Sequence, residues 1–243
     1  MILKIGIAGI SGRIGQRLVA LLQDDETAQV KCGLVAKNSR FSIKDIEVNT
    51  YCNDADIWID FSTPSAFETV LRHCIETKTP LVTGTTGLSK KHFIEIENAA
   101  QHIAVLSASN FAISINLIQN LLSSYTQLSP SKVNITETHH IHKADKPSGT
   151  AITLARNIKP HGILKKIDSN NFILDDINIK SIRTGEIAGI HQIDMDNEFE
   201  TINICHSAKT PKIFAQGAID IAKWLVVQQP GLYTMSDYIE SLS

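Results

Sequence analysis

The chain has 243 residues, of which 43% are hydrophobic, and its formal net charge is −2. This composition is that of an ordinary soluble globular protein, long enough for one large or two ordinary domains. The near-neutral charge, without a basic run, argues against a nucleic-acid-binding surface. No apolar stretch approaches the ~20 residues that span a membrane, so we expect neither a nucleic-acid nor a membrane partner.

The beginning of the chain and the cysteines bear on localisation. The sequence opens on a strand-like run and a glycine loop, MILKIGIAGISG, so we expect no signal peptide. The cysteines are scattered and include no Cys-x-x-Cys pair; they are Cys32, Cys52, Cys74 and Cys205. We interpret all four as small buried hydrophobic side chains in a reducing cytoplasm.

A glycine-rich loop follows the first predicted strand. Residues 2–8 are mostly aliphatic, which is typical of a strand buried on both faces of a parallel sheet. Glycines at positions 6, 9, 12 and 15 then lead into a run with apolar residues at helical spacing. Such a loop allows a pyrophosphate to approach the backbone and rest on the helix N-terminus, with Arg13 as a counter-charge. The alternative is that this glycine loop is a turn with a purely structural role and binds no dinucleotide.

The second predicted strand, residues 29–35, lacks the acidic residue that usually follows it and binds the adenosine ribose. Val35, Ala36 and Lys37 stand there instead. Lys37 or Arg40 could meet a 2′-phosphate, and either could equally be a solvated surface residue.

Alternating strands and helices continue to residue 107. We expect strands at 56–62, 80–83 and 103–107 and helices at 64–78 and 90–101. The stretch Gly84-Thr85-Thr86-Gly87 follows the strand that ends at Thr83. Glycine and hydroxyl residues at the carboxyl end of a strand suit a ring or phosphate lying across the sheet edge, although this stretch alone would more often be a turn.

The alternation then changes. A helix at 114–128 and a strand at 132–139 are followed by strands at 177–184, 190–194 and 199–206, joined by short turns. Consecutive strands of this kind predict an antiparallel or mixed sheet. A last amphipathic helix, 214–228, is expected to return to the first domain. We therefore predict an α/β fold: a Rossmann-like parallel-sheet nucleotide-binding domain (1–110 and 211–243) and an α+β domain (111–210) for substrate binding and oligomerisation.

The stretch Glu137 to Ala151, ETHHIHKADKPSGTA, carries the densest chemistry. Its imidazoles and its lysine ammonium suit general acid catalysis and the holding of an anion. The Pro-Ser-Gly-Thr turn then opens a helix-like run, predicted at 151–158. The first N–H groups of a helix lack partners and lie at the positive end of its dipole, so a substrate carboxylate fits there.

Two other interpretations of this stretch are open. It could be a solvated loop, or His140, His142 and Asp145 could ligate zinc. Side chains alternate along a strand, so His139 and His140 diverge, and no second cluster completes a ligand set. We expect no metal.

Taken together, these stretches resemble the dihydrodipicolinate reductase family of the diaminopimelate route to lysine. The similarity spans nearly the whole chain, through GIAGISGRIG, DFSTP, VTGTTG, SASNFAISIN, ETHHIHKADKPSGTA, SIRTGEIAGIH and FAQGAIDIAKWL. It implies reduction of 4-hydroxy-tetrahydrodipicolinate by NADPH or NADH, in the cytoplasm. Other nicotinamide-dependent oxidoreductases and a redox-sensing dinucleotide-binding protein are the rival classes.

The resemblance also implies residue roles. His139 would donate a proton, with Lys143 as its catalytic partner, and His140, Gly149 and Thr150 would hold the substrate carboxylates. Besides Lys37, the residues that would contact the cofactor are Gly9, Ile10, Ser11, Gly12, Arg13, Ile14, Gly84, Thr85, Thr86, Ala108, Ser109, Asn110 and Phe111. A homotetramer would form through the sheet of the second domain, where strands between Ile177 and Ile204 offer apolar faces.

Three features depart from the family pattern. The acidic residue after the second strand is absent, which puts a preference for NADH in doubt. The family arginine after His206 is missing, since Pro211 and Lys212 stand there. The segment 165–179 is shorter and lacks the family's glycine- and arginine-rich loop.

Overall fold

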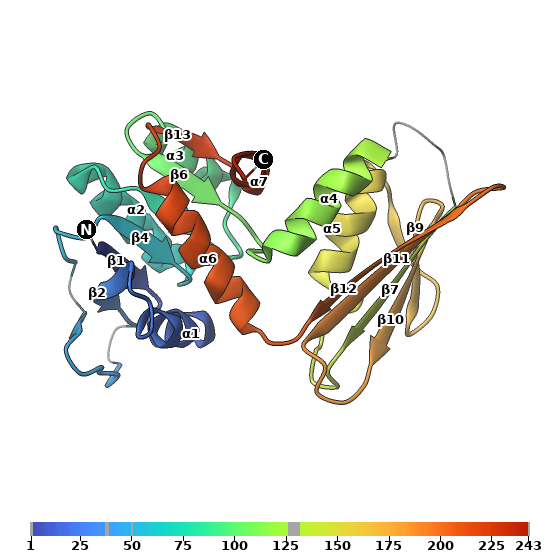
Figure 1. Ribbon diagram of the computed structural model, residues 1–243, viewed down its shortest axis with the longest axis horizontal. Helices are drawn as coiled ribbons and strands as arrows, with labels where there is room; N and C mark the ends of the chain where they lie inside the picture. The colour runs from blue at the N-terminus through green and yellow to red at the C-terminus, as the bar shows by residue number, and fades with distance from the viewer. Residues whose placement is uncertain (1, 37–38, 50, 126–131, 243) are drawn as a thin grey trace. The chain divides into compact units, whose positions relative to one another are not determined.

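A computed structural model describes residues 2–36, 39–49, 51–125 and 132–242. The chain forms two compact units, Met1–Ile113 with Lys212–Ser243, and Ser114–Pro211 (Figure 1). Within the described ranges, no helix is both long and apolar enough to cross a membrane.

The first unit is built on a seven-stranded sheet. In spatial order its strands are β13 (Gly231–Tyr233), β6 (Ala104–Ser107), β5 (Leu81–Thr83), β4 (Ile57–Asp60), β1 (Leu3–Ala8), β2 (Ala28–Leu34) and β3 (Glu47–Val48). Every neighbouring pair is parallel, which confirms the predicted parallel sheet. The chain passes from β1 to β2 on one side and then to β4 on the other. The loops after β1 and β4 therefore flank the point of reversal, where ligands bind in open α/β sheets.

Helices cover both faces of this sheet because its strands are apolar on both sides. Along β4, Ile57 and Ile59 belong to one buried cluster, whereas Trp58 belongs to another. The first cluster includes residues of α1 (Arg13–Leu22), α6 (Lys212–Leu225) and α7 (Met235–Glu240); the second includes residues of α2 (Pro64–Thr77) and α3 (Lys90–Ala99). The last long helix thus returns to the first unit, as predicted.

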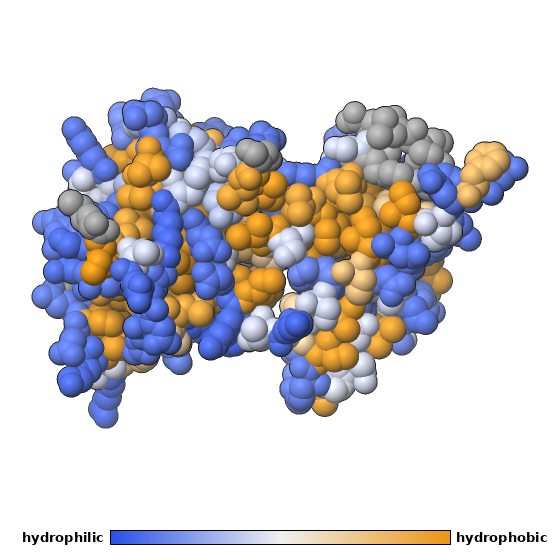
Figure 2. Space-filling view, viewed as in Figure 1, coloured by the Kyte–Doolittle hydropathy of each residue, from blue (hydrophilic) through white to orange (hydrophobic). Residues whose placement is uncertain are grey.

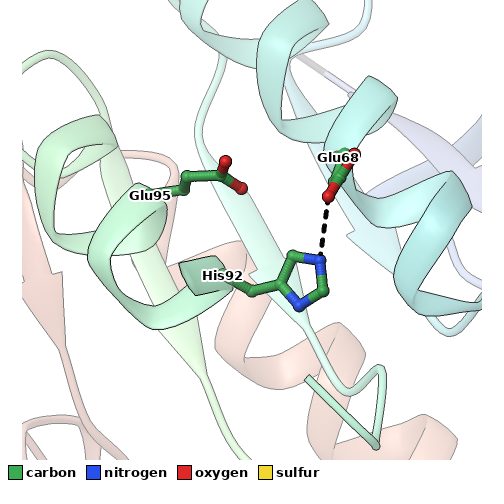
Figure 3. Close-up of side chains that lie close together, drawn as sticks. All are labelled: Glu68, His92 and Glu95. Atoms are coloured by element: carbon green, nitrogen blue, oxygen red, sulfur yellow. Dashed lines mark hydrogen bonds and ion pairs between the residues drawn. The ribbon is translucent and has the colours of Figure 1, made fainter. Parts of the chain in front are cut away.

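A polar cluster joins α2 to α3 (Figure 3). The Nδ1 atom of His92 accepts the backbone N–H of Ser89 at 2.9 Å, so the ring proton lies on Nε2, which is 3.1 Å from a Glu68 oxygen. The Lys91 ammonium lies 3.4 Å from Glu68 and 3.3 Å from Glu95. The cluster is therefore a network of hydrogen bonds and ion pairs between neighbouring helices.

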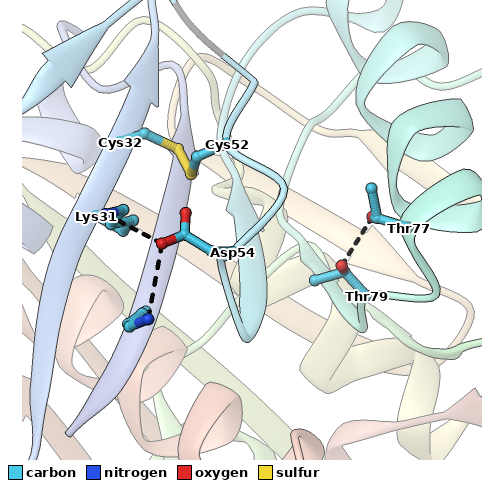
Figure 4. Close-up of a disulfide and its surroundings, with 7 residues drawn as sticks. Lys31, Cys32, Cys52, Asp54, Thr77 and Thr79 are labelled. Carbon is cyan, nitrogen blue, oxygen red and sulfur yellow. Dashed lines mark hydrogen bonds and ion pairs between the residues drawn. A yellow bond between two sulfur atoms is a disulfide. The ribbon is translucent and has the colours of Figure 1, made fainter.

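The cysteine interpretation was right about the burial of Cys32, Cys52 and Cys74, but wrong about the burial of Cys205 and about the reduced state of Cys32 and Cys52. Cys32, in β2, and Cys52, after β3, form a disulfide with their Cα atoms 6.2 Å apart (Figure 4). Parallel pairing of β2 with β3 brings the chain back beside Cys32, and a separation of 20 residues gave no sign of this in the sequence. Cys205 is exposed, and only Cys74 is a buried thiol, whose pKa burial raises.

The second unit has a six-stranded sheet. Its spatial order is β12 (Thr201–Ala208), β11 (Gly189–Asp196), β7 (Lys132–His139), β10 (Ile177–Arg183), β9 (Asn171–Leu174) and β8 (Leu164–Lys166). β10 runs parallel to β7 and the other pairs are antiparallel, which confirms the predicted mixed sheet. The helices are α4 (Ile113–Tyr125) and α5 (Gly149–Ile158). Residues 126–128, the end of the predicted helix 114–128, lie outside the described residues.

One face of this sheet forms the core of the second unit. Ile179 and Ile193 are at most 1% exposed and cluster with Leu154 of α5. Figure 1 shows both helices on this face. We expected an oligomer interface along the strands between Ile177 and Ile204. The side chains of this range that belong to the core are Ile177, Ile179, Ile193 and Met195, and Ile202 and Ile204 pack against it. Ile182 and Ile190 are half-buried and lie outside this cluster, and Phe199 is 89% exposed.

The α4 helix also carries an exposed apolar stripe. Leu117 and Leu121, one turn apart, are 55% and 53% exposed. Apolar residues gather over this helix in the space-filling view (Figure 2).

Candidate active site

The alternation of β7 places two functional groups on one face. Glu137 and His139 are two residues apart, so their side chains share a face of the strand, and both are buried. His140 follows the end of the strand and is half-buried; its backbone N–H donates to the carbonyl of Ile187 at 2.8 Å. The structure therefore separates the two adjacent histidines, as the strand geometry predicted.

Glu137 is the centre of a buried hydrogen-bond network. Its carboxylate accepts a short hydrogen bond from Nδ1 of His139 and two from the Arg183 guanidinium, at 3.0 and 2.9 Å. Burial by itself would raise the pKa of this carboxyl. The hydrogen bonds from His139 and Arg183, with the charge of Arg183, outweigh burial and lower the pKa to about 2. Glu137 is therefore ionised at neutral pH.

Lys143 lies in the turn after β7. Its ammonium is 2.8 Å from a carboxylate oxygen of Asp145. Burial would raise the pKa of Asp145, but the hydrogen bond and charge of Lys143 outweigh it and hold the pKa below its usual range. Arg183 donates to the backbone carbonyls of both residues, at 3.3 Å for Lys143 and 2.5 Å for Asp145. One guanidinium thus holds the turn and Glu137 together.

The N-terminus of α5 lies beside this network. Ser148 is the N-cap: its hydroxyl accepts the N–H of Ala151 at 3.2 Å, and its own N–H is 3.3 Å from Glu137. The helix therefore begins at Gly149, within the Pro-Ser-Gly-Thr turn that was expected to open it. Gly149 is exposed, with open space where a Cβ would lie, and Thr150 is half-buried. An anion could approach this positive helix end.

Sequence reasoning missed Glu137, Arg183 and His191 as members of the site. His191, on β11, lies opposite Glu137 in the strand register, and its ring centroid is 5.2 Å from that of His139. Burial, and then the neighbouring His139, lower the pKa of His191 to about 4. Glu137 could have been found, because it precedes His139 by two residues on the same strand. Arg183 and His191 lie in the stretch SIRTGEIAGIH that resembles the family, but no local pattern linked either residue to the site.

The zinc alternative does not fit the observed partners. Asp145 pairs with Lys143, and His142 is 3.9 Å from Glu186 with both side chains largely exposed. Among the residues that the structure describes, His140, His142 and Asp145 do not gather into one ligand group.

In the first unit, the glycine loop after β1 makes the close approaches that glycine permits. Gly9 has φ +78°, and a Cβ there would lie 2.2 Å from the carbonyl oxygen of Phe61. A Cβ on Gly15 would lie 2.3 Å from the carbonyl oxygen of Gly9. α1 begins at Arg13, and its N-cap Gly12 provides no side-chain cap. The geometry fits a loop that presents helix N–H groups to a phosphate.

The predicted cofactor residues of this loop differ in exposure. Gly12 and Arg13 are exposed, and Ser11 and Ile14 are half-buried. Ile10 is fully buried and belongs to the core, so only its backbone could reach a ligand. Lys37 lies outside the described residues.

Asp60, at the end of β4, organises the neighbouring loops and was also missed. Its carboxylate accepts hydrogen bonds from the hydroxyls of Ser62 at 2.5 Å, Thr83 at 2.8 Å and Thr85 at 2.7 Å. Burial raises the pKa of this carboxyl, against the effect of the hydrogen bonds. The Thr85 hydroxyl therefore donates its hydrogen bond within the protein, to Asp60. Thr86, by contrast, is exposed.

The remaining predicted residues follow β5 and β6. A Cβ on Gly84 would lie 2.2 Å from the ring of Phe61 and 2.8 Å from the ring of Phe111. Phe111 is 1% exposed, so its ring belongs to the core. Ala108 is half-buried, Ser109 is exposed, and Asn110 is half-buried with its side-chain oxygen 2.8 Å from the N–H of Ala112. All these loops lie at the carboxyl edge of the parallel sheet.

Fold and site together define a class. A parallel sheet with a glycine loop at its point of reversal, joined to a unit that gathers histidine, lysine and an open helix N-terminus, is typical of a nucleotide-dependent oxidoreductase acting on a small acid. The sequence matches two family models, described as "Dihydrodipicolinate reductase, N-terminus" over residues 3–111 and "Dihydrodipicolinate reductase, C-terminus" over residues 114–239. The chain belongs to the dihydrodipicolinate reductase family, whose enzymes are oxidoreductases of lysine and diaminopimelate biosynthesis.

Relatives agree with this assignment, and solved structures share the fold. A 4-hydroxy-tetrahydrodipicolinate reductase from a Nitratiruptor species is 37% identical, covering 97% of this chain and 98% of its own. One from Bdellovibrio bacteriovorus is 34% identical, covering 98% and 96%. A dipicolinate-bound dihydrodipicolinate reductase from a Paenisporosarcina species has a TM-score of 0.83 at 22% identity, covering 96% and 98%. An oxidoreductase from Agrobacterium radiobacter, in complex with NAD⁺, L-tartaric acid and magnesium, has a TM-score of 0.61 at 11% identity, covering 100% and 90%.

Proposed function

We propose that the protein reduces 4-hydroxy-tetrahydrodipicolinate to tetrahydrodipicolinate with NADPH or NADH. The single observation that carries this proposal is the juxtaposition in the second unit. Glu137 and Arg183 join the buried His139, held through Nδ1, to the turn of Lys143 and to the N-terminus of α5. This helix end has open space at Gly149. The names of the relatives and the dipicolinate bound to the Paenisporosarcina enzyme support a small dicarboxylate as substrate.

In the proposed mechanism the protein binds the substrate and supplies a proton. When bound, the reduced nicotinamide supplies a hydride to an electron-poor carbon of the cyclic imine. His139 then protonates the neighbouring carbon, and Lys143 stabilises the negative charge that develops on the substrate. His140, the N–H of Gly149 and the hydroxyl of Thr150 hold the carboxylates.

The first unit holds the dinucleotide in this proposal. The glycine loop after β1 and the Gly84 to Thr86 and Ala108 to Phe111 loops would contact it along the carboxyl edge of the sheet. NADPH is used at least as well as NADH, because Val35 and Ala36 replace the carboxylate that would bind the ribose hydroxyls and repel a 2′-phosphate.

We further propose a cytoplasmic homotetramer that associates through the sheet of the second unit, without nucleic-acid or membrane partners. Family resemblance supports this assembly. A monomer by light scattering at micromolar concentration would contradict it.

The central test uses a coupled assay with freshly generated substrate, with NADH and NADPH run in parallel. His139→Gln is expected to lower turnover by about 10²–10⁴-fold, the usual loss for a positioned general acid, with little change in cofactor affinity. His161→Gln, at an exposed histidine after α5, is the matched control. A His139 variant that keeps more than half of wild-type turnover contradicts the assignment. NADPH binding without imine turnover by the wild type would instead favour a redox-sensing protein.

A further inference from the structure

Glu137 is a charged side chain with no exposed surface, and the proposed reaction does not itself use it. A buried carboxylate is unfavourable unless donors surround it. Here His139, both terminal nitrogens of Arg183 and the N–H of Ser148 lie at hydrogen-bonding distance. Arg183 is itself nearly buried, with 7% of its side chain exposed. The fold thus maintains a complete Arg–Glu–His network beside the substrate site.

The network fixes which nitrogen of His139 faces the substrate. An ionised carboxylate can only accept, so the Nδ1 atom that contacts Glu137 carries a proton. Nε2 is then the nitrogen that can exchange a proton with a ligand. The residue opposite this nitrogen must be small, because a Cβ added to Gly189 would lie only 3.0 Å from Nε2.

Arg183 couples this orientation to the turn that carries Lys143. In the register of β10 with β7, Arg183 lies directly opposite His139. Its guanidinium binds Glu137 with two parallel hydrogen bonds, and the same group binds the carbonyls of Lys143 and Asp145. The positive charge of Arg183 also balances the negative charge of Glu137. The carboxylate that holds the imidazolium of His139 is therefore already paired with a cation.

We propose that Glu137 and Arg183 are positioning residues for the reduction: Glu137 fixes the tautomer of His139, and Arg183 fixes Glu137 relative to the Lys143 turn. This inference rests on the proposed function. In the protonation step, the Nε2–H bond breaks and a C–H bond forms on the substrate. His139 is left neutral with its proton on Nδ1, and solvent returns the Nε2 proton.

The first test needs no activity. In wild-type protein with isotope-labelled histidine, two-bond proton–nitrogen NMR spectra should show neutral His139 with hydrogen on Nδ1. In Glu137→Gln, where the amide can donate as well as accept, the two tautomers should mix. A wild-type His139 with hydrogen on Nε2 would overturn the proposal, and this measurement is independent of whether any variant folds.

The second test is kinetic. Glu137→Gln is expected to lower kcat about 10²-fold with little change in either KM, because losing an orienting carboxylate affects the transition state more than binding. Arg183→Lys keeps the charge but loses the two-pronged geometry, and should lower kcat about tenfold. Glu198→Gln and Arg156→Lys, both at exposed positions, are matched controls. Unchanged kcat in both variants would overturn the proposal. If the wild type reduces no imine, the proposed function fails while the tautomer result still decides the positioning role.

Discussion

The buried carboxyl of Glu137 should make the stability of the second unit depend on acid. Its pKa falls from the ordinary 4.5 to about 2 on folding, mainly through His139 and Arg183 acting against burial. At 1.36 kcal/mol per unit, this difference corresponds to about 3 kcal/mol. Because the folded-state pKa is depressed, this stabilisation is present above the unfolded-state pKa of 4.5. It is lost as the pH falls from there toward 2.

The assay must report on the second unit alone. Both tryptophans, Trp58 and Trp224, belong to the first unit, so tryptophan fluorescence would miss the effect. Hydrogen exchange of the β7 and β10 amides, corrected for the intrinsic rate, measures the free energy of opening where Glu137 lies. The free energy of opening should be larger in the wild type than in Glu137→Gln. This difference should shrink by about 3 kcal/mol when the pH is lowered from 6 to 2. Glu198→Gln should follow the wild type. If the difference in opening free energy between the wild type and Glu137→Gln does not change with pH, the pKa of the Glu137 carboxyl is not depressed.

Three further predictions concern the substrate, the cofactor and the disulfide. Thr150→Val should raise KM more than it lowers kcat, because a ground-state hydroxyl contact is lost while the helix N–H groups remain; an unchanged KM would make the turn purely structural. Lys37→Ala should weaken NADPH but not NADH, and the wild-type preference should shrink with salt; a tenfold kcat/KM preference for NADH at low salt would contradict this. Cys52→Ser should lower the unfolding free energy of the oxidised first unit by about 3 kcal/mol, the value for closing a loop of this length. Tryptophan fluorescence in urea measures this change, with Cys205→Ser as the control; a difference that persists after reduction would rule out the disulfide as its cause.

Local patterns in the sequence were sufficient to predict most of the architecture. Aliphatic runs predicted the strands β1, β4 and β6, because strands buried on both faces need apolar residues at every position. The strand predicted at 132–139 is β7, which begins at Lys132 and ends at His139 as expected. The sequence did not predict the short elements, which are the strands β3, β8, β9 and β13 and the helix α7. A segment of two to six residues is too short to show a hydrophobic period that would distinguish it from a loop.

The glycine loop and the His–Lys stretch were recognised because their chemistry is local. A turn that requires φ > 0 at Gly9, or a helix N-cap at Ser148, depends on residues adjacent in the chain. The sequence therefore determined by itself the family, the two-unit organisation of the fold and the stretch that carries His139 and Lys143.

Only the tertiary structure decided which distant side chains complete these features. Arg183 reaches Glu137 across 46 positions because β10 pairs in parallel with β7, and Cys52 reaches Cys32 because β3 returns beside β2. The same pairing places Ile179 and Ile193 in one cluster with Leu154 of α5. The physical reason is that strand register and layer packing join residues far apart in the chain, and no local pattern encodes that pairing.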